Sequence, residues 1–189
     1  MAAACGLFLQ RIRRGTRRSS SAPRVVRVGT HALKENGSTV LWTRLSQHRG
    51  RAGTGSGNHR GSIFRLIVGK SLIAQRGYEY PTWGNGNNAA KDIRAGEVAL
   101  ECEVSDVIGA MPVLWLGIDD DAGPGSLRGF IERNAIALLS NYRKASLDPP
   151  SSGWLGHHCD RSGSAGQGSG IQTTSMKATT RNSWERWSG

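Results

Sequence analysis

The sequence predicts a small α+β domain, because strand-like runs and helical patterns alternate along the first 145 residues. Apolar runs of strand length occur at 25–29 and 111–118. Between them, apolar residues recur every three or four positions, as they do in amphipathic helices. The chain has 189 residues, enough to bury a core in one domain with tails. It has no run of 18 apolar residues, so no membrane-spanning helix and no membrane partner are expected.

The first half of the chain is predicted to hold one strand and two helices. Residues 25–29 are rich in β-branched side chains and end at a glycine, as short strands often do. A helix is expected from Thr39 to His48, with Ser38 as its N-cap. The segment 50–61 holds five glycines and is interpreted as a flexible basic loop. A second helix is expected over 62–76, with an apolar stripe made of Phe64, Ile67, Val68, Leu72 and Ile73.

The second half is predicted to continue with a helix, a strand and another helix. Residues 97–108 fit a helix in which Glu97 and Glu101 face solvent. Residues 111–118 form a nearly continuous apolar run of strand length. An acidic turn then leads to the last clear helix, from Gly129 to Asn141.

The positive charge is concentrated at the N-terminal end. Residues 1–60 carry 12 Lys and Arg against one acid, and the formal net charge of the chain is +11. Such a field attracts polyanions, of which nucleic acid is the usual one; a solvated basic tail is the alternative. We divide the chain into a basic irregular segment at 1–24, a domain at 25–145 with a helical insert at 61–110, and a Gly- and Ser-rich tail at 146–189.

The cysteines favour an intracellular protein without disulfides, and we expect a cytoplasmic location. Cys5, Cys102 and Cys159 are odd in number and lack the CxxC spacing of zinc or redox sites. The first 24 residues are also rich in arginine and serine, as organellar transit peptides are, which is the alternative. No small-molecule cofactor is expected, and the sequence leaves the oligomeric state open.

Four polar residues have the chemistry of a phosphodiester-cleaving site. Arg44 and His48 lie one helical turn apart and share a helix face. Glu132 and Asn141 lie near opposite ends of the helix that follows the second apolar run. A guanidinium suits a phosphate, one carboxylate can hold a hydrated Mg²⁺, and a histidine can relay a proton. The alternative is a set of solvent-facing helix charges.

These residues resemble the motifs of the GIY-YIG nuclease family. Residues 25–31 (VVRVGTH) resemble the second half of its signature, and residues 41–48 (LWTRLSQH) resemble the helix with its catalytic arginine. Residues 130–141 resemble the later helix with its metal-binding glutamate. The residues of these three segments are most similar to those of bacterial GIY-YIG domain proteins. The first motif is degenerate, because its nearest counterpart is Gly6-Leu7-Phe8, in which phenylalanine has no hydroxyl. The tyrosine of the second motif is absent, with Arg27 in that neighbourhood.

The resemblance implies a fold, an activity and a set of roles. The implied fold is a three-stranded antiparallel sheet flanked by helices. The implied activity is hydrolysis of DNA phosphodiesters with Mg²⁺ or another divalent cation. Glu132 would hold the metal ion and Arg44 would stabilise the pentacovalent phosphate. His48 resembles a catalytic histidine of the homing-endonuclease branch, and His31 is a candidate for proton transfer.

Further residues complete the expected site. Gly29 and Asn141 are expected to order the site or its backbone. Nucleic acid is expected to contact the basic residues Arg27, Arg49, Arg51, His59 and Arg60. Because the motif tyrosines are missing, whether the chain is an enzyme stays open. The alternative is a catalytically inactive protein that binds nucleic acid or another partner on the same scaffold.

A reading-frame hypothesis concerns both termini. The codons for residues 172–187, read in the −1 frame, permit the sequence NHVDEGYDPKFL, which is more typical of a protein end. A +1 shift near residues 5–17 likewise permits VYFF followed by an acidic run. Under this hypothesis most arginines of the first 24 residues are accidental, and the basic field shrinks. Resequencing the gene tests it: two intact reading frames would refute the hypothesis.

Overall fold

The computed structural model describes residues 3–10, 24–35, 37–51, 54, 57–140 and 152–159, with the backbone alone for residues 3–10, 24 and 140. This part of the chain contains β1 (Ala3–Gln10), β2 (Arg24–Gly29), α1 (Leu41–Arg49), η1 (His59–Gly61), α2 (Ile63–Arg76), α3 (Lys91–Gly109), β3 (Val113–Ile118), α4 (Leu127–Ser140) and η2 (Leu155–His158). The composition is that of the α+β class, as the sequence predicts. No helix in the described ranges is long and apolar enough to cross a bilayer.

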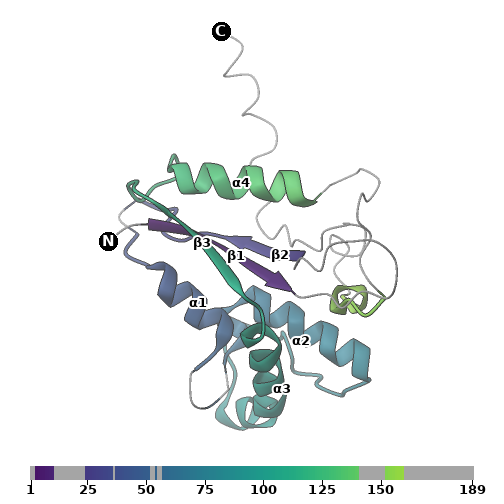
Figure 1. Ribbon diagram of the computed structural model, residues 1–189. Helices are drawn as coiled ribbons and strands as arrows, with labels where there is room; N and C mark the ends of the chain where they lie inside the picture. The colour runs from purple at the N-terminus through teal and green to yellow at the C-terminus, as the bar shows by residue number, and fades with distance from the viewer. Residues whose placement is uncertain are drawn as a thin grey trace.

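The strands pair in the order β2-β1-β3, with β1 antiparallel to both neighbours (Figure 1). The Cα partner of Phe8 is Arg27, and that of Leu9 is Val25. Val26 is therefore an extra residue in β2, which is the geometry of a β-bulge. The bulge explains why Val26 and Val28, two positions apart, belong to cores on different sides of the sheet.

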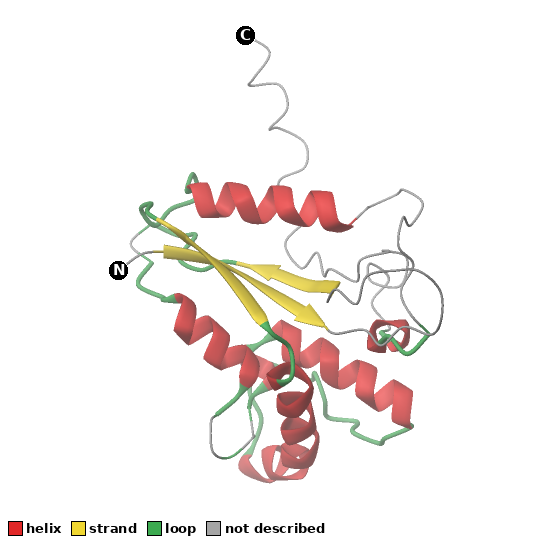
Figure 2. Cartoon of the chain, in the orientation of Figure 1, coloured by secondary structure: helices red, strands yellow, loops and turns green. Residues whose placement is uncertain are grey.

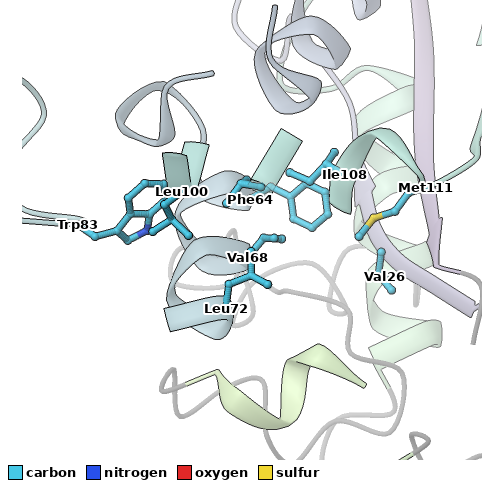
Figure 3. Packing of buried hydrophobic residues seen from close by; sticks show 9 residues of the cluster. Val26, Phe64, Val68, Leu72, Trp83, Leu100, Ile108 and Met111 are labelled. Atoms are coloured by element: carbon cyan, nitrogen blue, oxygen red, sulfur yellow. The ribbon is translucent and has the colours of Figure 1, made fainter. Parts of the chain in front are cut away.

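The helices cover both faces of the sheet. Figure 2 shows α4 on one face and α1, α2 and α3 on the other. Under α4 lies a small core in which Val28, Ile118 and Ile136 are buried. The larger core on the opposite face, drawn in Figure 3, consists of Val26, Phe64, Val68, Leu72, Trp83, Leu100, Val104, Ile108 and Met111.

The helix caps follow the sequence at α2 but not at α1. Ser62 caps α2, because its Oγ accepts the Arg65 backbone N–H across 3.3 Å. The expected cap Ser38 is wrong, since α1 begins after Val40, which makes no side-chain cap bond. The apolar stripe predicted for α2 is confirmed, and it supplies Phe64 and three further buried residues, Ile67, Val68 and Leu72.

The assignment of residues 1–24 to an irregular segment is corrected by β1, the central strand at Ala3–Gln10. Its partners begin at residues 24 and 113, so the pairing that makes it a strand is not local in sequence. Residues 61–110 hold α2 and α3, which supply most of the larger core. This segment therefore enlarges the domain and packs on the sheet.

Candidate functional site

Three of the expected site residues come together at the C-terminal end of β2. The Thr30 backbone N–H, directly after β2, donates to Glu132 Oε1 on α4 across 3.2 Å. Arg27 on β2 and Arg44 on α1 both interact electrostatically with Glu132. The end of β2 thus collects one carboxylate and two guanidinium groups from three separate elements, which is a charge arrangement suited to a phosphodiester.

Arg27 is a buried cation, with only 8 % of its surface exposed. Its guanidinium lies 5.5 Å from the centre of the Phe64 ring and passes along Gly29. A Cβ at Gly29 would lie 3.6 Å from Arg27 Nη2, so any longer side chain there would compete for the same space. Burial and the nearby Arg44 lower the pKa of Arg27 to about 10, against the opposing effect of Glu132.

Glu132 lies in the second turn of α4, and burial raises the pKa of its carboxyl above the ordinary value. The Thr30 N–H and the cations Arg27, Arg133 and Arg44 act in the opposite direction. A proton therefore competes with any cation that Glu132 binds, and it does so more strongly as the pH falls.

The donor set around Glu132 fits a hydrated magnesium ion. The described residues contain no group of three His, Cys, Asp or Glu that could form a metal cage, so an ion held by Glu132 would have at most one other such side chain as a ligand. Mg²⁺ keeps several of its waters and is often bound by one or two carboxylates together with substrate phosphates. A carboxylate beside two guanidinium groups that could contact a phosphate is compatible with that mode.

Arg44 and His48 lie on α1, as expected, but in different environments. Arg44 is half-buried, and its Nη1 donates to Gln47 Oε1 across 3.0 Å. His48 is buried, and its Nδ1 shares a hydrogen bond of 2.7 Å with Ser62 Oγ. Burial, followed by the charges of Arg27, Arg44 and Arg65, lowers the pKa of His48 to about 3. His48 is therefore neutral at physiological pH.

The low pKa of His48 predicts how stability depends on pH. Between about 3 and 6.5 the unfolded chain binds a proton at His48 that the folded chain does not. The free energy of unfolding should therefore fall as the pH drops through this window, by up to about 1.4 kcal/mol per unit. Denaturant unfolding at neutral and mildly acidic pH, compared with His48→Asn, checks this. An equal loss of stability in both proteins would contradict the assignment.

His31 lies in the segment after β2 and is buried, with 7 % of its surface exposed. The next residue, Ala32, has a φ of 51°, in the left-handed region. Arg128, which is 2 % exposed, holds this turn: its Nη2 donates to the Ala32 carbonyl across 3.2 Å, and its Nη1 donates to Asp120 Oδ1 across 2.9 Å. Sequence reasoning missed this link, which ties the start of α4 to the segment that carries Thr30.

His59 belongs to a buried polar network. Its Nδ1–H donates to Glu101 Oε1 across 2.9 Å, and its Nε2 accepts the Gly84 N–H across 3.1 Å. The His59 ring also stacks on Trp83, with centroids 3.8 Å apart. With 2 % of its surface exposed, His59 is placed to hold three segments together rather than to face a nucleic acid.

Arg60, Arg49 and Arg51 differ in how much of their guanidinium faces solvent. Arg60 donates to both carboxylate oxygens of Glu97, at 2.6 and 3.0 Å, and this pair is almost wholly buried. Arg49 is exposed, and its Nη2 donates to the Gly109 carbonyl across 3.0 Å. Arg51 is also exposed. Asn141 lies outside the described residues.

The expectation that Glu97 and Glu101 face solvent is wrong, because their exposed fractions are 2 % and 6 %. Each of the two glutamates pairs with its own arginine. Arg60 pairs with Glu97, and the wholly buried Arg65 donates its Nε to Glu101 Oε2 across 3.0 Å. Although burial alone would raise the pKa of Glu101, hydrogen bonds from His59 and Arg65 hold it below the ordinary value. Paired charges of this kind tolerate burial where single charges do not.

Comparison with known protein families finds a match to the family described as GIY-YIG domain, over residues 4–168. The chain belongs to the GIY-YIG domain family. Membership suggests a nuclease-type activity and implies a nucleic-acid substrate. Comparisons with curated proteins and with solved structures find no match.

The pairing of β1 and β2 places the two halves of the GIY-YIG signature side by side. The Cα partners are Gly6 with Gly29 and Phe8 with Arg27. The residues that resemble the first motif therefore lie directly opposite those that resemble the second. Phe8 and Arg27, which lie in the neighbourhoods where the family motifs have tyrosines, are paired across the two strands.

Proposed function

We propose that this GIY-YIG domain is a metal-dependent endonuclease that hydrolyses DNA phosphodiester bonds. The proposal is carried by the meeting of Glu132, Arg27 and Arg44 at the end of β2, because carboxylate and guanidinium groups together suit a metal-bound phosphate. We also propose that the β2-β1-β3 sheet corresponds to the three-stranded sheet of the family, and that the protein works in the cytoplasm.

The proposed roles follow from the surroundings of each side chain. Glu132 would hold Mg²⁺ or another divalent cation, with its carboxylate oriented by the Thr30 N–H. A bound cation of this kind supplies charge stabilisation at the phosphate and an activated water. Arg44 presents a guanidinium that stabilises the charge of the pentacovalent phosphate. The half-buried position of Arg44 strengthens that interaction relative to one in open water.

The proposal assigns further roles to His48, His31 and Asn141. His48, neutral and bonded to Ser62, is suited to position the arginines around it rather than to donate a proton from an imidazolium. His31 remains the proposed proton-transfer group, since it directly follows the residue that binds Glu132. Asn141 is retained as a residue that orders the end of the last helix.

One observation favours the alternative of an inactive, nucleic-acid-binding scaffold. Arg27 lies in the neighbourhood where the family's second motif has a tyrosine, and its cation lies near the Glu132 carboxylate. A guanidinium has no acceptor atom, so it cannot take up a proton as a base, and its charge competes with a metal ion for the carboxylate. In that case the cluster would bind a phosphate without cleaving its ester bonds.

Nicking of supercoiled plasmid by the full chain separates these two functions. We expect nicking in Mg²⁺ that stops when the metal is chelated with EDTA, because phosphoryl transfer at a single carboxylate depends on the cation. Plasmid that is bound but stays supercoiled in both Mg²⁺ and Mn²⁺ would contradict the nuclease proposal and support the inactive scaffold.

A further inference from the structure

A groove of about 470 Å³ opens beside the candidate site. Its walls come from the C-terminal end of α1, the segment 57–61 and the N-terminal half of α3. Its lining is polar and glycine-rich, and it includes Gln47, Arg51, Asn58 and Arg94. Gly57 in the wall packs against the buried Arg65, whose guanidinium would overlap a Cβ at that position. The packing of Gly57 against a buried side chain therefore fixes this wall of the groove.

Gln47 links the groove to the candidate site. Arg44 Nη1, at the site, donates to Gln47 Oε1, and Gln47 lines the groove. A strand whose phosphate lies at Arg44 would reach the groove by passing Gln47.

The charge of the groove is positive although two glutamates line it. Glu97 is neutralised by Arg60, and Glu101 is neutralised by Arg65. Arg51 and Arg94 are exposed, and the ion pairs found among the described residues include neither of them. Two guanidinium charges thus remain for a ligand. The groove lining also contains no aromatic side chain, so base stacking has no platform there.

We propose that this groove binds the phosphodiester backbone of the nucleic acid next to the scissile phosphate, with Arg51 and Arg94 as phosphate contacts. The proposal rests on the proposed function for the place of the scissile phosphate. It removes Arg60 and His59 from the nucleic-acid contacts, because both are held by buried glutamates. Contacts to the backbone alone predict binding that is independent of base sequence.

The salt dependence of DNA binding tests the groove. Each neutralised phosphate of a duplex contributes about 0.9 to the slope of log K against log salt concentration. The double variant Arg51→Gln/Arg94→Gln should therefore lower the magnitude of the slope by about 1.8 for two lost contacts. Affinity for a short fluorescent duplex is measured in EDTA, from about 50 to about 200 mM salt.

The matched control is Lys34→Gln/Arg76→Gln, which removes the same charge from exposed positions outside the groove. It should keep the wild-type slope. An unchanged slope in the groove variant, or an equal decrease in both variants, would overturn the proposal. Thermal unfolding of the two variants should stay close to the wild type, because all four side chains are exposed and lie outside the core, and the ion pair of Arg76 with Glu103 is partly exposed to solvent.

The two proposals fail separately in these experiments. Binding is measured without a divalent cation, so the slope does not depend on catalysis. If the wild-type chain nicks plasmid and the groove variant keeps the wild-type slope, the groove proposal is overturned and the nuclease proposal stands. If the wild-type chain does not nick plasmid and the slope falls in the groove variant alone, the nuclease proposal is overturned and the groove proposal stands.

Discussion

Replacing Glu101 with leucine is expected to lower the free energy of unfolding by about 3–5 kcal/mol. Arg65 is wholly buried, and its Nε and Nη2 both donate to Glu101. The substitution leaves that guanidinium without its counter-charge, and it also removes the acceptor of the His59 Nδ1–H. For a chain of this length the melting temperature should fall by about 6–20 °C.

Two further variants make the Glu101 prediction specific. Glu103→Leu changes the same residue type on the same helix, but Glu103 pairs with Arg76, whose side chain is 49 % exposed. The ion pair of Glu103 with Arg76 should contribute less than about 1 kcal/mol to the free energy of unfolding. Adding Arg65→Met to Glu101→Leu should recover part of the lost stability, because an apolar pair leaves no buried charge. Equal losses for Glu101→Leu and Glu103→Leu would contradict the buried-pair account.

Replacing Arg44 with methionine is expected to reduce the single-turnover rate of DNA cleavage by about 10²–10³-fold. Methionine keeps much of the side-chain volume and removes the guanidinium that we propose contacts the phosphate. Arg44→Lys restores the charge without the planar fork, so it should recover only part of the rate. The measurement uses saturating protein over labelled DNA, so that weaker binding does not enter the rate.

Arg49→Met is the matched control for Arg44, since both arginines lie on α1. Arg49 is exposed and donates to the Gly109 carbonyl, away from the residues around Glu132. Its substitution should leave the single-turnover rate near the wild-type value. A full rate in Arg44→Met, or equal losses in both variants, would show that Arg44 does not act on the phosphate.

Local sequence patterns predict the elements whose information is local. The β-branched run gives β2, and the apolar stripe with Ser62 before it gives α2 and its cap. The strand β1 was missed because its neighbours in the sheet lie far along the chain, at β2 and β3. Residues 3–9 are nevertheless an almost continuous apolar run of strand length, a local signal that the assignment to an irregular segment overlooked.

The two misplaced glutamates show a signal that was present in the sequence. Positions 97, 100, 101, 104 and 108 follow helical spacing, so Glu97 and Glu101 share the face of Leu100, Val104 and Ile108. That face is buried. The partners could not be predicted, because Arg65 lies 36 residues and Arg60 lies 37 residues from the glutamate that each one holds.

The candidate site was predicted in part. The sequence singled out Arg44, Glu132 and Arg27, and the fold brings all three to the end of β2. It did not reveal that Arg128 and Asp120 fix the segment after β2, because that function depends on a hydrogen bond to the carbonyl of Ala32. Tertiary contacts of this kind produce no periodic pattern in the sequence.

The most direct test of the central claim is the Mg²⁺-dependent rate of plasmid nicking by Glu132→Gln. Asn134→Ala is the matched control, an exposed residue of α4 whose amide donates to the Phe130 carbonyl. We predict that Glu132→Gln folds and loses Mg²⁺-dependent nicking, while Asn134→Ala nicks at the wild-type rate. A folded Glu132→Gln protein that nicks in Mg²⁺ as fast as the wild type would contradict the account.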